Sequence, residues 1–313
     1  MAFIDGMRSA GHAVESICRV FTEHGCPVAA RTYRVWKQGR PVSARAVRDA
    51  HVIDALLATT GTPESLYGRR KMTVFLRRSG HEVAFCTVDR LMADLGMNGV
   101  RRGRGVRTTV PAKDGHRAGD LLNRDFTAVT PNTRWIADFT YVRSWAGFVY
   151  VAFVVDIFAQ RIIGWHAATT KHTELVLTCV RMAIWQRIHE GHPVVAGELL
   201  HHSDAGSQYT SLHFTEHLAL EGIAPSIGTV GDAYDNGLME SIIGIYKTEC
   251  IRPGPFHAEP LRTISDIEFA TMAWVDWFNN RRLHGNIGMV PPVEYETAHY
   301  AATPALQPEP QPT

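Results

Sequence analysis

Three acidic residues stand out because their sequence neighbours are unusual for surface carboxylates. Asp138 lies inside WIADFTYVR, Asp204 follows GELLHHS, and Glu240 lies within DAYDNGLMESIIGIYKTEC, with 35 residues between it and Asp204. Acidic side chains are rarely buried unless they are paired or bind a metal. Carboxylates gathered around one point are the ligands that Mg²⁺ prefers. Two such ions about 4 Å apart can activate an attacking oxygen and stabilise the leaving one in a phosphoryl displacement.

For any one of these acids alone, a structural cap or a solvated surface charge is the simpler interpretation. Their settings favour reading them together. The two aspartates lie in, or at the end of, segments that predict strands, and a sheet is a rigid platform for side chains. The spacing i, i+4, i+8, i+11 places Asn236, Glu240, Gly244 and Lys247 on one face of a predicted helix. That face carries a carboxylate, a small gap and a cation.

Residues 135–300 alternate strand-like and helix-like patterns and predict an α/β domain. Strands are expected at 135–143, 148–158, 161–168, 197–202 and 223–227, and helices at 173–189, 211–221, 235–250 and 263–280. Short connections between the first three strands predict antiparallel hairpins, so the expected sheet is mixed and five-stranded, with helices flanking it. Asp156 is interpreted as a strand-end or turn residue rather than an accessory carboxylate. Trp274, Trp277 and Phe278 are expected in the core rather than on a base-stacking surface.

The first 97 residues predict short amphipathic helices and contain a weak internal repeat. Residues 20–36 and 74–91 both read helix, glycine, Val-Ala, threonine and a second apolar helix. Gly25 and Gly80 stand where a helix must end, because glycine adopts the left-handed conformation at little cost. Ala29 and Ala84 are small enough to let two helices pack closely. The pattern is typical of a helix-turn-helix, although one copy alone would fit a plain helical hairpin.

The two halves of the chain carry opposite charges. Residues 1–134 contain 22 basic and 12 acidic side chains, whereas residues 135–313 contain 10 and 19. Such an asymmetry favours a nucleic-acid partner for the basic half. The side chains expected to neutralise DNA phosphates are Arg69, Arg70, Lys71, Arg77, Arg78, Arg101, Arg102, Arg104 and Arg107.

The patterns divide the chain into five parts. Residues 1–60 and 61–97 are expected to form two helix-turn-helix-like regions, 98–134 a basic linker, 135–300 the α/β core, and 301–313 a Pro-rich disordered tail. The longest apolar run, 148–155, is far shorter than the roughly 20 residues of a membrane span. The N-terminus lacks the apolar core of a signal peptide. Five cysteines without a C-x-x-C pair fit a reducing cytoplasm.

Two patterns that could indicate zinc are better explained by chance. Residues 213–217, HFTEH, match the H-x-x-E-H form of some zinc peptidases, but the chain has 16 histidines and the predicted helix is short. His12, Cys18, His24 and Cys26 lack the ligand spacing of a zinc finger. No zinc is therefore expected.

Four segments, taken in order, resemble the catalytic region of DDE transposases, which have a ribonuclease-H-like or retroviral-integrase-like core. The segments are WIADFTYV, HHSDAGSQYTS, GDAYDNGLMESIIGIYKTEC and WFNNRRLHGNIGMVPPVEYE. The resemblance is greatest to the second-frame (OrfB-type) transposases of two-frame bacterial insertion sequences. The helix-turn-helix pattern and YGRRKMTVFLRRSG also resemble that family's upstream region, so the resemblance is nearly full length. Ile287 stands where the family usually has leucine, a mild departure.

The resemblance implies a catalytic triad of Asp138, Asp204 and Glu240 that holds two Mg²⁺ ions, with Mn²⁺ able to substitute. It implies that Lys247 touches DNA phosphate. Accessory motif positions fall on Ser203, Gln208, Asn236, Arg282 and His284. The implied activity is metal-dependent hydrolysis of a phosphodiester at the ends of an insertion sequence, followed by 3′-OH strand transfer.

The implied partners are double-stranded DNA, both insertion-sequence ends and target, and further copies of the chain in a dimer or higher oligomer. The expected location is the bacterial cytoplasm, at the nucleoid. The sequence shows no sustained heptads of a coiled coil. In the family that it resembles, an upstream frame typically supplies a further helix-turn-helix and a leucine zipper, so the resemblance implies such a protein as a candidate partner. Two alternatives stay open: a catalytically silent DNA-binding regulator of the full-length transposase, and a ribonuclease-H-like nuclease without strand transfer.

Overall fold

The structure is a computed structural model, and it describes residues 1–39, 42–101, 127–204, 206–228 and 237–302. Contacts divide the chain into two units, Met1–Asp54 and Ala55–Thr313. Three of the proposed phosphate-binding side chains, Arg102, Arg104 and Arg107, lie outside the described residues, as do Asn236 and residues 303–313 of the proposed tail. Residues 301 and 302, expected in that tail, belong to the last helix instead. No helix in the described ranges is both long and apolar enough to cross a membrane.

The first unit is helical. It contains α1 (Ala2–Ser9), α2 (Val14–Glu23) and α3 (Ala30–Gln38), and α4 (Ala44–Leu57) begins within it. Apolar residues spaced along α1 and α2 meet Tyr33 of α3 in a small core with Ile4, Ile17 and Cys18. The amphipathic spacing of these short helices thus produces the packing that the sequence predicts.

The second unit begins with a helical part in which two helices are joined by a glycine-containing turn, as α2 and α3 are in the first unit. It contains a short 3₁₀ helix, η1 (Pro63–Leu66), then α5 (Arg69–Arg78) and α6 (Phe85–Asp94). Gly25 follows α2 with φ +79° and Gly80 follows α5 with φ +89°, so both glycines end a helix as expected. The expectation for Ala29 and Ala84 is wrong. Both are exposed residues at the start of the second helix, and in the second copy the neighbouring Val83 is the buried one.

The rest of the second unit is built on a mixed five-stranded sheet, as predicted. Its strands are β1 (Arg134–Ser144), β2 (Gly147–Asp156), β3 (Arg161–Ala168), β4 (Leu200–Ser203) and β5 (Ala224–Ile227). The strand order is β3-β2-β1-β4-β5. The first three strands are antiparallel, whereas β4 lies parallel to β1 and β5 parallel to β4.

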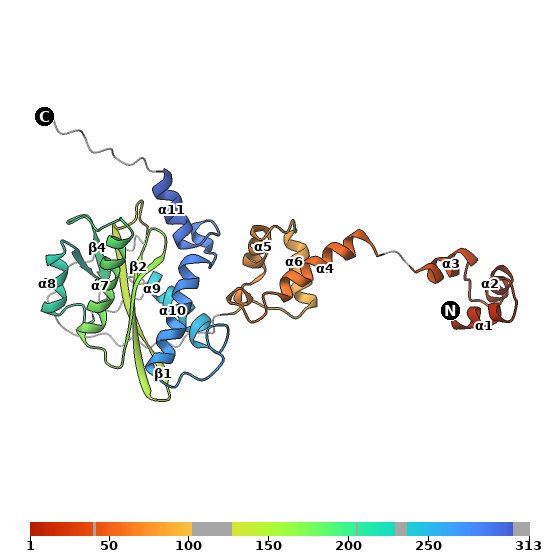
Figure 1. Ribbon diagram of the computed structural model, residues 1–313, viewed down its shortest axis with the longest axis horizontal. Helices are drawn as coiled ribbons and strands as arrows, with labels where there is room; N and C mark the ends of the chain where they lie inside the picture. Colours follow the sequence, from red (N-terminus) through yellow and green to blue (C-terminus); the bar gives the residue numbers. More distant parts are fainter. Residues whose placement is uncertain (40–41, 102–126, 205, 229–236, 303–313) are drawn as a thin grey trace. The chain divides into compact units, whose positions relative to one another are not determined.

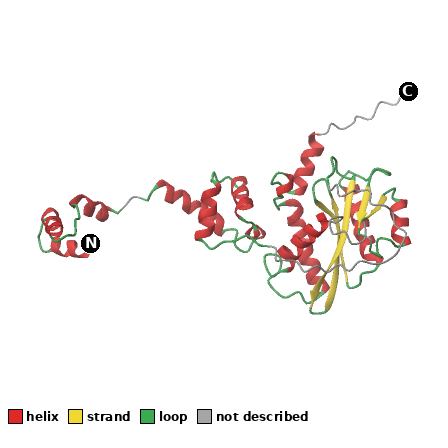
Figure 2. Cartoon of the chain, turned by 180° about the vertical axis from the view of Figure 1, so that it is seen from behind, coloured by secondary structure: helices red, strands yellow, loops and turns green. Residues whose placement is uncertain are grey.

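Helices cover both faces of the sheet (Figures 1 and 2). On one face, α7 (Thr173–His189) and α8 (Leu212–Leu220) pack on apolar residues of β1, β2 and β3. On the other, Phe153 of β2 contacts Tyr246 of α9 (Gly237–Tyr246) and Trp274 of α10 (Ile264–Asn280). The prediction that Trp274, Trp277 and Phe278 lie in the core is confirmed, since all three are buried.

The helix predicted over 235–250 is not one regular helix in its described part. After Tyr246 the chain continues as a π-helical segment, η2 (Lys247–Ile251), which makes wider turns than an α-helix. A 3₁₀ turn, η3 (Gly285–Ile287), and helix α11 (Pro292–Ala302) then complete the fold. Because of the π-helical segment, Lys247 begins a wider turn at the point where α9 ends.

Candidate active site

The sheet brings two of the three acids to neighbouring strand ends. The parallel ladder between β1 and β4 ends with Ala137 opposite Ser203. The next residues are Asp138 on β1 and Asp204 just beyond β4. Neighbouring strands lie about 4.8 Å apart, so two acids that follow the last paired residues lie close together.

Glu240 approaches the same place from α9. Met239, Ile242 and Tyr246 of this helix are buried, and Glu240 is on its exposed side. The pKa of Asp138 is raised to about 8, first because surrounding protein excludes water and then because the carboxylates of Asp204 and Glu240 repel its charge. Exclusion of water also raises the pKa of Asp204. Asp138 therefore lies near enough to both other acids for their charges to act on it.

The donor set fits a hard divalent cation. All three side chains are carboxylates, and positive charge between them would relieve the repulsion that raises the pKa of Asp138. Within the described residues, no three His, Cys, Asp or Glu side chains are already arranged to hold a metal ion. Mg²⁺ usually keeps several waters and takes only one or two carboxylates, so it suits an open set of acids. Asp138, Asp204 and Glu240 are the side chains that would hold it.

Lys247 lies beside this acidic cluster. Its ammonium nitrogen, Nζ, stands 5.1 Å from the centre of the Tyr141 ring, and its charge acts on Asp138. Partial burial lowers the pKa of Lys247, and the nearby carboxylate opposes that change. Among the described residues no carboxylate lies within ion-pair distance of Lys247. Its position next to the acids is the one expected of a phosphate contact.

Of the described accessory motif residues, Ser203 and Gln208 lie beside Asp204, whereas Arg282 and His284 make their contacts elsewhere. Ser203 is buried at the end of β4, and Gln208 donates a hydrogen bond to the carbonyl of Lys171 at 2.9 Å. Arg282 forms a two-pronged buried ion pair with Glu249, with Nη2 and Oε1 2.7 Å apart. The ring of His284 donates to the carbonyl of Phe278. These residues therefore support the elements around the site.

Several of the proposed phosphate-binding cations are held by other protein groups. Arg69 pairs with Asp89 at 2.5 Å, the guanidinium of Arg77 donates to the carbonyl of Val83, and Arg78 pairs with Glu294 of α11. Lys71 lies over the ring of Tyr67, and burial together with Arg282 lowers its pKa to about 8. Arg70 and Arg101 are exposed.

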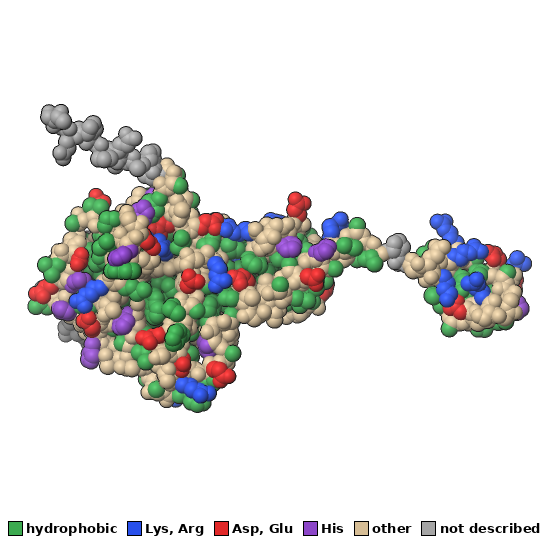
Figure 3. Space-filling view, viewed as in Figure 1, with side chains coloured by type: hydrophobic (Ala, Val, Ile, Leu, Met, Phe, Trp, Pro, Cys, Tyr) green, Lys and Arg blue, Asp and Glu red, His purple; other side chains and the backbone are tan. Residues whose placement is uncertain are grey.

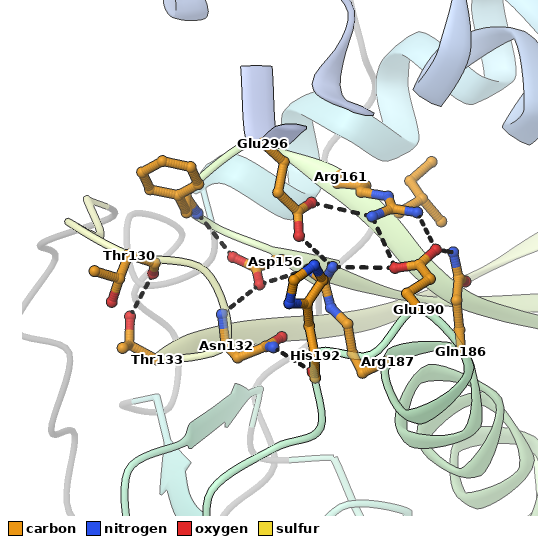
Figure 4. A network of polar contacts seen from close by, with 12 residues as sticks. Thr130, Asn132, Thr133, Asp156, Arg161, Gln186, Arg187, Glu190, His192 and Glu296 are labelled. Atoms are coloured by element: carbon orange, nitrogen blue, oxygen red, sulfur yellow. Dashed lines mark hydrogen bonds and ion pairs between the residues drawn. The ribbon is translucent and has the colours of Figure 1, made fainter. Parts of the chain in front are cut away.

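A buried charge network is a feature that sequence reasoning missed (Figure 4). Asp156 does end β2, but it is fully buried and pairs with Arg187 of α7 at 2.8 Å. Arg187 also pairs with Glu296 of α11, which in turn accepts from Arg161 of β3. The network ties α7 and α11 to the sheet. The available signal was a cation at a core-facing position of a predicted helix, but the sequence does not identify its partners.

A mixed sheet in this order, with acids on β1, after β4 and on α9, defines an integrase-type core. Residues 128–233 and 221–292 match family models described as integrase core domain, and residues 45–105 match one described as HTH-like domain. The β1–β4 ladder and the helix that carries Glu240 lie inside the two core matches.

Sequence relatives show which proteins with an integrase core this chain is similar to. A putative transposase of insertion sequence element IS986/IS6110 from Mycobacterium tuberculosis is 48% identical over 275 residues, which cover 88% of this chain and 97% of that protein. The transposase of IS629 from Shigella sonnei is 45% identical over 260 residues, 83% of each chain. Among solved structures, the integrase catalytic core of HTLV-2 in complex with magnesium is 17% identical and covers 54% of this chain and 98% of that chain, with a TM-score of 0.38.

The chain belongs to the family of bacterial insertion-sequence transposases with an integrase core. The resemblance inferred from the sequence is thereby confirmed, as is the expected fold: a ribonuclease-H-like core preceded by helical regions with a helix-turn-helix-like domain. Integrase and helix-turn-helix domains together imply that the protein binds DNA.

Proposed function

We propose that this chain is a metal-dependent transposase that cuts DNA at the ends of an insertion sequence and joins the freed 3′ end to target DNA. The observation that supports the proposal is the position of Asp138 and Asp204 at neighbouring strand ends, with the charge of Glu240 also acting on Asp138, within a chain related to transposases. The relatives' names supply the biological setting, and the acidic cluster supplies the chemistry.

Two phosphodiester displacements make up the reaction. In the first, a water oxygen bonds to phosphorus, the bond to the 3′ oxygen breaks, and that oxygen takes a proton. In the second, the new 3′-hydroxyl bonds to a target phosphorus, displaces the target's own 3′ oxygen and gives up its proton. Both displacements follow the same geometry, so one site can serve both.

Two divalent cations, when bound, would supply the Lewis acidity that both displacements need. Asp138 and Asp204 would hold the cations at the ends of two paired strands, which limits the movement of these side chains. Glu240 completes the set from α9. Lys247 binds a phosphate next to the reacting one and orients the strand. Mg²⁺ is the expected ion, with Mn²⁺ as a substitute.

The N-terminal helices would hold the DNA. The helix-turn-helix-like region over α5 and α6 presents Arg70 to solvent, and the basic residues 101–107 follow it along the chain. Two ends must be joined to one target, so the active form is expected to be a dimer or a higher oligomer. An upstream-frame protein with a helix-turn-helix and a leucine zipper is the proposed further partner, and the bacterial nucleoid the proposed location.

Incubation of the full chain with labelled insertion-sequence end DNA and Mg²⁺ tests this function. Cleaved and joined products are expected with the wild-type chain and neither product with Glu240→Gln. Glu216→Gln, an exposed acid on α8, is the matched control and should behave like wild type. Cleavage without joining would indicate a nuclease, and DNA binding without cleavage would indicate a regulator; either result contradicts the proposal.

A further inference from the structure

The hairpin of β1 and β2 extends past the helices that cover the sheet (Figure 2). On the face that carries α7 and α8, Phe139 and Tyr150 pack partly against the core. Beyond them the same face continues with Tyr141 and Phe148, which are 47% and 53% exposed. Side chains at alternate positions of a strand share a face, so these four rings form one continuous row. Large apolar side chains are rarely left exposed in such a row without a partner.

The rings are ordered with respect to one another. The centres of Phe139 and Tyr150 lie 6.4 Å apart and those of Tyr141 and Phe148 lie 5.4 Å apart, both in edge-to-face geometry. The turn that closes the hairpin is fixed as well, because the backbone N–H of Trp145 donates to the carbonyl of Leu261 at 3.2 Å. The row is therefore a preformed surface.

Cations accompany the rings. Lys247 lies over Tyr141, and Arg262 lies over the exposed ring of Trp145 at 5.3 Å. Arg143 is exposed on the same face as Tyr141. No acidic residue occurs between Phe139 and Val155. Figure 3 shows hydrophobic and basic side chains, with acidic ones next to them, at the end of the core in which this hairpin lies.

Lys247 links this face to the acidic cluster. It interacts with both Tyr141 and Asp138, which lie three residues apart on β1. Strand β4 pairs with one edge of β1 only as far as Ala137. From Asp138 onward, this edge of β1 is no longer paired with β4. Asp138 is on the opposite face of β1 from Tyr141, and Lys247 is near both side chains.

We infer that Tyr141, Phe148 and the cations beside them form a platform on which unpaired bases next to the cut phosphodiester stack. Aromatic rings interleaved with basic side chains are the usual means of binding single-stranded nucleic acid without regard to sequence. The inference rests on the proposed function, since the reaction frees a 3′ end that must leave its duplex to reach the target. Lys247 would hold the phosphate while the rings hold the bases.

The test compares two DNA probes of mixed sequence that bind the full chain without added metal. One is a blunt duplex, and the other carries a 3′ single-stranded extension of about four nucleotides. The platform predicts that wild type binds the extended duplex about tenfold more tightly than the blunt one, as stacking of one or two bases allows. Tyr141→Leu and Phe148→Leu should each remove most of this preference, and Tyr141→Phe should keep it. Phe269→Leu, at a 68% exposed ring on α10, is the matched control and should keep it too.

Three outcomes would overturn the platform: equal binding of both probes by wild type, a preference that survives in the leucine variants, or an equal loss for both probes. A change of oligomeric state in Tyr141→Leu with unchanged DNA binding would also overturn it and would make this face a contact between copies. The cleavage assay separates the two proposals. Cleavage and joining without any preference for the extension would leave the function standing and remove the platform. The preference without cleavage would do the reverse.

Discussion

Replacement of Arg187 by methionine would remove the centre of the buried charge network. The side chains of Arg187, Asp156 and Glu296 are 0%, 1% and 2% exposed. Methionine fills much of the same space but leaves two carboxylates in the interior. Glu296 keeps a cationic partner, Arg161 at 3.2 Å, whereas Asp156 keeps only the hydrogen bonds from the backbone N–H groups of Asn132 and Phe158 among the described residues. Loss of one partner from a buried ion pair costs about 3–5 kcal/mol.

Urea unfolding measures this cost. With a slope of about 3 kcal/mol per molar urea, the midpoint of Arg187→Met should fall by roughly 1–2 M. Arg181→Met is the matched control on the same helix. Arg181 is 47% exposed and pairs with Glu174, itself 62% exposed, so its loss should cost less than about 1 kcal/mol.

A second substitution sharpens the test. Neutralisation of Asp156 in the Arg187→Met background should recover part of the loss, because the penalty comes from an uncompensated buried charge. A midpoint for Arg187→Met no lower than that of Arg181→Met would refute the reasoning. So would a double variant that is less stable than Arg187→Met alone.

Three further predictions follow from other buried or charged groups. Burial lowers the pKa of His201 from 6.5 to about 4, so the unfolded chain takes up a proton before the folded one does and stability falls as pH drops from about 6.5 toward 4. Protonation of His201 in the unfolded chain lowers the free energy of unfolding by about 2 kcal/mol at pH 5. The urea midpoint of the wild-type chain should therefore be lower at pH 5 than at pH 7, and His201→Leu should make this difference smaller. A difference that His201→Leu leaves unchanged would contradict the prediction. Tyr67→Phe leaves the buried N–H of Leu283 without its 3.0 Å acceptor and should cost about 1–3 kcal/mol in the same assay, so a neutral effect would exclude this contact. Lys247→Ala should lower the slope of log affinity against log salt for DNA by about 1, whereas Lys171→Ala, at an exposed lysine, should leave it unchanged; equal slopes for both would remove the phosphate contact.

The strands were predictable because their side chains repeat a simple pattern. The continuous apolar run at 148–155 became the central β2, and the expected strand 161–168 has the bounds of β3. The short fourth strand was less well defined. It was expected at 197–202 and lies at Leu200–Ser203, since a strand of four residues offers little periodicity. The π-helical segment after Tyr246 leaves no mark in the apolar spacing.

The acids could be found from their neighbours, but the position of Asp138 beside Asp204 could not be derived from periodicity alone. It depends on the parallel pairing of β1 with β4, which joins segments about 65 residues apart, and such pairings are not visible in one sequence. The same reason explains the missed network, in which Arg187 and Glu296 are separated by 109 positions. It also explains why the sequence does not reveal that Arg78, proposed to contact DNA, pairs with Glu294, 216 positions away.

The central claim is that Asp138, Asp204 and Glu240 act as one catalytic unit. The most direct test is the rate of Mg²⁺-dependent cleavage of insertion-sequence end DNA by Asp138→Asn, Glu240→Gln and the double variant. Residues that act as a unit show losses that do not multiply. Each single variant should lose activity by about 10³-fold or more, and the double variant should be no slower than either single one. Losses that multiply in the double variant, or substantial activity in Glu240→Gln, would contradict the account.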